Sequence, residues 1–167
     1  MDAIRNQIRR AIPLVQPLRL DMVKVGEMYG AWMVASTTMS LREEVNVEDG
    51  SKYQALGGEV YFKGEINVRG RYEPNDLEGG VIFYPDDKFY RFFPIVVQNP
   101  SSKNLALHDG ELRVGLFGGF AGLDAASSAT GISTIQLSDL IFQKVSCSNC
   151  DPWQGFFVEQ AVSLIKN

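Results

Sequence analysis

The sequence predicts a single, mainly β domain, built as an antiparallel β-sandwich with about seven or eight strands. Segments of alternating apolar and polar residues follow one another from about residue 28 to residue 145. Turn signals separate them at intervals of roughly ten residues, and no strand–helix–strand alternation interrupts them. The 167 residues, 45% of them hydrophobic and 22% charged, are enough for one domain with a sizeable core.

Two long strands are expected, each with an interruption. Over residues 59–72 apolar side chains alternate with polar ones, and Gly64 breaks the alternation. This pattern predicts a half-buried antiparallel strand with a bulge or kink at Gly64. Residues 132–145 alternate in the same way, with an interruption expected at Ser138 and Asp139.

Two β-hairpins are predicted from apolar segments joined by short turn signals. The first pairs residues 81–84 with residues 89–97 across a four-residue loop. The second pairs residues 105–107 with residues 112–117 around an Asp-Gly turn at 109–110.

The two ends of the chain are expected to differ from this β body. Residues 1–25 predict a basic arm ahead of a domain of residues 26–167. The arm has five basic and two acidic residues, a net charge of +3, whereas the whole chain has −4. Residues 2–12 predict a short amphipathic helix. Its expected interface side chains are Ile4, Ile8, Arg9 and Ile12. Residues 153–166 predict a C-terminal helix after Pro152, with a final strand as the alternative.

The sequence has no recognisable catalytic apparatus, and no cofactor is predicted. The one histidine, His108, lies beside an Asp-Gly turn, where a general base would lack an enclosed site. Cys147 and Cys150 form a C-x-x-C pair, which is compatible with a metal site, a redox motif, a disulfide or two inert thiols. Most paired acids fall at predicted turns, where Asp is favoured for local hydrogen bonding.

The aromatic residues between 83 and 93 are the densest in the chain. In an extended segment every second side chain would pack into the core, and the alternate set, with the aromatic side chains of Tyr90 and Phe92, would form a second apolar face. We therefore expect Tyr90 and Phe92 to lie at a subunit interface.

Composition also limits the partners and the location. A pI near 5.0 argues against broad nucleic-acid binding, which needs clustered Lys and Arg. A membrane-surface contact by the N-terminal arm remains open. No apolar run reaches the roughly 18 residues that span a bilayer, and arginines interrupt any signal-peptide core, so synthesis in the cytoplasm is expected.

A basic arm at residues 1–22 followed by strands and turns from Tyr29 to Val145 resembles the small single jelly-roll coat and vertex proteins of icosahedral viruses. The resemblance is one of architecture, and it implies a non-enzymatic, self-associating structural subunit of a virion capsid, vertex or tail. The implied partners are further copies of the chain and other assembly proteins. One alternative is a ligand-binding sandwich or barrel for carbohydrate or lipid. A second is a redox or metal protein that uses Cys147 and Cys150.

Overall fold

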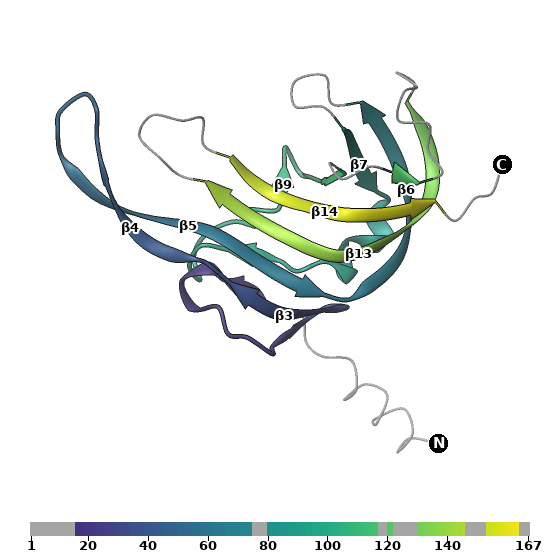
Figure 1. The fold of residues 1–167 in the computed structure, drawn as a ribbon, viewed down its shortest axis with the longest axis horizontal. Coiled ribbons are helices and arrows are strands. Elements are labelled where there is room, and N and C mark those ends of the chain that lie inside the picture. The colour runs from purple at the N-terminus through teal and green to yellow at the C-terminus, as the bar shows by residue number, and fades with distance from the viewer. Residues whose placement is uncertain (1–15, 75–79, 117–119, 122–129, 146–152, 164–167) are drawn as a thin grey trace, which may run out of the picture.

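A computed structural model describes residues 16–74, 80–116, 120–121, 130–145 and 153–163 (Figure 1). The strands are β1 Leu18–Arg19, β2 Met28–Tyr29, β3 Trp32–Thr37, β4 Ser40–Val45, β5 Lys52–Lys63, β6 Glu65–Pro74, β7 Val81–Pro85, β8 Val96–Val97, β9 Leu107–His108, β10 Glu111–Leu112, β11 Val114–Leu116, β12 Phe120–Ala121, β13 Gly131–Val145 and β14 Trp153–Ser163. Two 3₁₀ helices, η1 Leu20–Met22 and η2 Asp87–Phe92, complete the described elements. The mainly β class is confirmed. Ten strands are joined in one sheet, not divided between the two sheets of a sandwich.

β5 and β6 act as one bent strand that runs antiparallel along β13. Tyr61 pairs with Ile141 on one side of Gly64, and Glu65 pairs with Ser138 on the other, so the register shifts by one residue at the bend. At this point the backbone N–H of Asp139 donates to the Gly64 carbonyl at 3.1 Å. The interruptions predicted in the two strands therefore face each other as one irregularity.

The main strands close into a ring of hydrogen-bonded neighbours. In chain order the ring has five members: the bent strand β5–β6, then β7, then β11 with β12, then β13, and last β14. The neighbours around the ring follow the order first, second, third, fifth, fourth and back to the first. Only the third and fifth members run parallel, and the other contacts are antiparallel. This is the strand order of the OB-fold, a five-stranded Greek-key barrel.

Inward side chains of the ring and of β3 form one core with the segments that pack over them. Phe142 and Phe156 meet edge to face at 5.4 Å between ring centroids, and Phe93 lies 6.0 Å from Phe156. Leu18 is fully buried where β1 pairs with β8, so the described chain is anchored in the core close to its first residue. Burial of these side chains is the main favourable term for the fold.

The prediction of a hairpin between residues 81–84 and 89–97 is wrong. Residues 87–92 form η2, and only Val96–Val97 of the expected second strand is a strand, paired with β1. Both edges of β7 are already occupied, by β6 and by β11, so residues 89–97 have no edge of β7 to join. The second predicted hairpin is confirmed only around its turn, where β9 pairs with β10 and both Asp109 and Gly110 have positive φ. Val114–Leu116, expected in its second strand, pairs with β7 and β14.

The prediction of a C-terminal helix is also wrong, because residues 153–163 form β14. Apolar residues of both parities, such as Phe156 and Phe157, suggested a helix. They belong to a strand that is paired on both edges, with β13 on one side and β11 and β12 on the other. No helix among the described residues is long and apolar enough to span a membrane.

Candidate binding face

The outward side of β6, β7 and β10, continued by residue 113 and β14, carries the main cluster of polar and aromatic side chains. Because side chains alternate along a strand, those of Val114 and Phe156 point into the core, and those of the residues next to them point outward. The outward residues of this face are Arg71, Glu73, Tyr84, His108, Glu111, Arg113, Trp153 and Phe157. We call this set the outer face. The pairings β6–β7, β7–β11 and β11–β14 bring its ring strands together, and the hairpin of β9 and β10 with residue 113 adds the rest.

Tyr84 is the centre of one half of the outer face. The guanidinium of Arg71 lies 4.1 Å from the centroid of its ring, and its hydroxyl donates to Glu73 Oε1 at 2.7 Å. Arg71 also pairs with Glu111 Oε2 at 3.0 Å. Partial burial, and then the hydrogen bond to Glu73, raise the pKa of Tyr84, so the ring stays neutral at physiological pH.

His108 and Arg113 occupy the other half, beside β14. Arg113 Nη2 lies 2.9 Å from His108 Nδ1. A guanidinium can only donate, so Nδ1 accepts and the proton of the neutral ring is on Nε2. Burial, and then the charge of Arg113, lower the pKa of His108. Gly155 leaves room for this ring, because a Cβ at that position would lie 3.2 Å from His108 Nε2.

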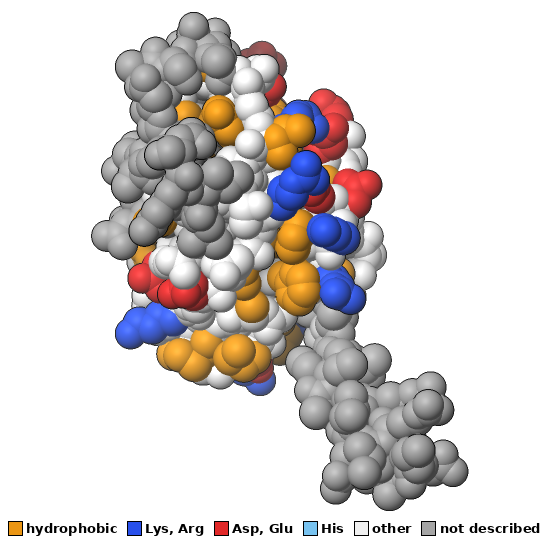
Figure 2. Space-filling model, turned by 90° about the vertical axis from the view of Figure 1, so that its right-hand side faces the viewer, with side chains coloured by type: hydrophobic (Ala, Val, Ile, Leu, Met, Phe, Trp, Pro, Cys, Tyr) orange, Lys and Arg blue, Asp and Glu red, His pale blue; other side chains and the backbone are white. Residues whose placement is uncertain are grey.

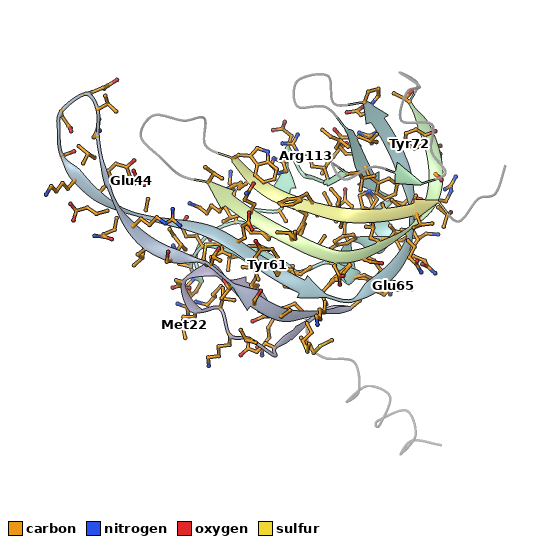
Figure 3. All side chains as sticks on the ribbon, viewed as in Figure 1. Met22, Glu44, Tyr61, Glu65, Tyr72 and Arg113 are labelled. Atoms are coloured by element: carbon orange, nitrogen blue, oxygen red, sulfur yellow. The ribbon has the colours of Figure 1, made fainter. Side chains whose placement is uncertain are left out.

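Trp153 and Phe157 extend the outer face along β14. Their ring centroids lie 6.2 Å apart, and Gly155 lies between them in the strand. Arg113 directly precedes β11, the strand that pairs with β14 on one side and β7 on the other, so its side chain lies between those two strands (Figure 3). The outer face therefore combines aromatic rings with guanidinium and carboxylate groups, and contacts among these side chains hold them in place.

The charges of the outer face nearly cancel. Two arginines oppose two glutamates, and His108 is neutral. Figure 2 views the molecule from the side on which β6 lies in Figure 1. It shows basic, acidic and hydrophobic side chains interleaved, with no continuous basic surface.

A second feature is the hairpin of β4 and the first half of β5, which projects beyond the body (Figure 1). At its base a cavity of about 300 Å³ is lined by residues of both signs, including Arg42, Glu44 and Lys144. Lys144 Nζ donates to the Leu56 carbonyl at 2.8 Å, and burial lowers the pKa of Lys144. This bond satisfies a carbonyl where β5 leaves β13, which is a structural role.

The predicted site residues fall in different places. Ile4, Ile8, Arg9 and Ile12 lie outside the described residues, as do Cys147 and Cys150. Tyr90 and Phe92 lie in η2 and are partly buried. The Tyr90 hydroxyl accepts the Leu112 backbone N–H at 3.0 Å, which ties η2 to β10, and the interface role of both residues stays a prediction. Among the described residues no group of three or more His, Cys, Asp or Glu side chains is arranged to hold a metal ion.

Sequence reasoning missed the outer face. Tyr84 belongs to the aromatic segment that the sequence did single out, but Arg71 and Arg113 alternate with apolar residues, which is the pattern of an ordinary solvated surface. Comparison with known proteins gave no match to a family model, a curated protein or a solved structure.

Proposed function

We propose that the chain is a non-enzymatic binding module whose outer face takes a neutral oligosaccharide. The observation that carries this proposal is the cluster around Tyr84, in which an aromatic ring lies among arginine, glutamate and histidine side chains. It spans the first and second members of a ring with OB-fold order and reaches the start of the third, and the face of the second and third strands is where such barrels hold oligonucleotides or oligosaccharides.

The charge balance favours a neutral ligand over a nucleic acid. A polyanion is held by releasing counterions from several phosphates, which requires an excess of Lys and Arg along its path. Here Glu111 neutralises Arg71, Glu73 lies beside Tyr84, and the whole chain carries −4. Sugar hydroxyls, in contrast, use paired donors and acceptors, and their apolar faces stack on aromatic rings.

A glycan array followed by calorimetry tests the proposal. We expect one class of neutral oligosaccharide to bind, with Arg113→Gln weakening binding roughly tenfold through loss of a charge-assisted hydrogen bond. Arg42→Gln, an arginine change on the projecting hairpin, is the matched control and should leave affinity unchanged. A chain that binds no glycan, or that binds single-stranded DNA more tightly than any glycan, refutes the proposal.

A second candidate is the self-associating structural subunit of a virion that the sequence suggested. It is supported by the projecting hairpin, whose apolar side chains have no cover within the described residues. Light scattering at several concentrations tests it, because a subunit of this kind forms an oligomer of defined size. A monomer at every concentration refutes it.

A further inference from the structure

A second cavity, of about 230 Å³, lies between η2 and the hairpin of β9 and β10. Leu107 and Leu112 pair across this hairpin and line the cavity, whereas the neighbouring pair, His108 and Glu111, belongs to the outer face. Because side chains alternate along a strand, the hairpin separates the two regions. The cavity therefore has a lining of its own, distinct from the residues that surround Tyr84.

The walls of this cavity are mainly apolar. Its apolar and aromatic lining consists of the side chains of Tyr90, Phe93, Pro94, Ile95, Leu107 and Leu112. An apolar cavity of about 150 Å³ is large enough to hold one benzene molecule. The cavity of this chain therefore has room for one ring with a small substituent, and it is smaller than the roughly 300–1,000 Å³ of a pocket for a drug-sized ligand.

The polar groups of the lining are available as donors. Asn104 Oδ1 already accepts the backbone N–H groups of Val96 and Ala106, at 3.1 and 3.0 Å, so the amide Nδ2 is the end that is left to donate. The Tyr90 hydroxyl accepts the Leu112 backbone N–H at 3.0 Å, which leaves its own proton for another acceptor. A ligand group that accepts hydrogen bonds is therefore the best match for this lining.

Charge indicates that this acceptor is an anion. Arg91 is exposed, and it is the only charged residue among the described residues that line the cavity. It takes part in no ion pair found in the described part of the chain, and its guanidinium lies 4.8 Å from the centroid of the Phe92 ring. The N–H donors of this guanidinium are thus free, and a carboxylate matches them in both charge and geometry.

We propose that this cavity binds a small aromatic carboxylate, with its ring between the apolar walls and its carboxylate at Arg91. The rings of Tyr90 and Phe93 favour an aromatic ligand, because contacts between aromatic rings add to the stabilisation that burial alone supplies. Burial of the ring supplies most of the affinity, and the carboxylate fixes the orientation. The inference is independent of both the oligosaccharide proposal and the proposed self-association.

Phenylacetate, which has one ring and one carboxylate, is the probe for this site. We expect it to bind the full chain with a dissociation constant of roughly 0.1–1 mM, as is usual for a ligand of about ten non-hydrogen atoms. In a methyl NMR spectrum its ring should shift the signals of Ile95, Leu107 and Leu112. The signals of Leu41 and Val45, on the projecting hairpin, should stay in place. Acetate, which has the charge without the ring, should cause no shift.

Variants separate the contribution of the charge from that of the ring. Arg91→Gln should weaken phenylacetate roughly fivefold, and it should leave the uncharged 2-phenylethanol within about twofold. Arg42→Gln, an arginine change at the cavity of the projecting hairpin, is the matched control and should leave both ligands unchanged. Leu107→Trp fills the cavity and should abolish the binding of both, whereas Leu107→Met keeps its volume and should not. Circular dichroism checks that each variant is folded.

Several results would overturn the assignment. One is a phenylacetate that does not bind below about 10 mM, or that shifts only methyl groups outside the cavity. Another is a loss of affinity in Arg42→Gln and none in Arg91→Gln, which would place the carboxylate at the other cavity. Equal weakening of phenylacetate and 2-phenylethanol by Arg91→Gln would refute the carboxylate contact, even if Leu107→Trp did not fold. Hexanoate that binds as tightly as phenylacetate would refute the aromatic class.

Discussion

Replacing Gly64 with alanine should destabilise the fold at the bend that joins β5 to β6. Gly64 has a φ of +155°, which L side chains rarely adopt, and a Cβ there would lie 2.6 Å from the Ala31 carbonyl oxygen and 2.9 Å from Trp32 Cε3. Backbone strain contributes about 1–3 kcal/mol and overpacking a similar amount. The lower entropy of the unfolded alanine chain offsets about 0.4–1 kcal/mol. We expect a net loss of about 2–5 kcal/mol.

The loss is measured as a shift in melting temperature, and the control is a glycine at which alanine would strain the backbone without a steric clash. Gly50, at the tip of the hairpin, has a φ of +72°, and a Cβ there would meet nothing within 4 Å. Gly50→Ala should therefore cost about 1 kcal/mol. At about 2–4 °C per kcal/mol for a domain of this size, the expected shifts are roughly 4–20 °C for Gly64→Ala and 2–4 °C for Gly50→Ala. Equal shifts would refute the steric argument at Gly64.

Three further predictions follow from single groups. Asp139 has a φ of +57°, so Asp139→Gly should raise the stability by about 0.5–1 kcal/mol in a urea titration, and a loss would contradict the assigned strain. The folded pKa of His108 lies below its unfolded value, so the unfolded state binds more protons and stability falls as pH drops below about 6.5. The fall should be shallower in His108→Gln, and an unchanged slope from pH 7 to 5 would contradict the assignment. Burial, and then the hydrogen bond to Glu27, raise the pKa of Tyr29 to about 12, so in an ultraviolet titration Glu27→Gln should shift one late tyrosine to lower pH, whereas no shift would mean that burial alone sets it.

Local chemistry was sufficient to predict the irregular points of the strands. Gly64 interrupts an alternation that is otherwise regular, and Asp139 is a residue that tolerates positive φ. Each was expected as a break in its own strand, and the structure places the two breaks opposite each other. The Asp109-Gly110 turn was predictable for the same reason, because both residues favour the backbone that a tight hairpin needs.

Pairings between distant segments were not predictable from these local signals. Val114–Leu116 runs parallel to Phe156–Val158, more than forty residues later, and this contact closes the ring. A short apolar segment is compatible with a strand or with a buried helix turn until its neighbours are known. η2 shows the same limit, since Phe89–Phe92 became helical where no strand edge was left to pair with.

Ring closure also explains why the outer face could not be predicted from the sequence. Arg71 and Arg113 look like ordinary polar residues that alternate with apolar ones, and only the contacts β6–β7 and β7–β11 make them neighbours of Tyr84. Closure pairs β6, β7, β11, β13 and β14 on both edges, whereas β4 pairs only with β5 among the described strands. The two proposed functions, oligosaccharide binding and self-association, therefore use separate surfaces. Arg113→Gln should leave oligomer size unchanged, and Glu44→Lys with Glu48→Lys on the hairpin should leave oligosaccharide affinity unchanged, so a variant that alters both would show that the surfaces are coupled.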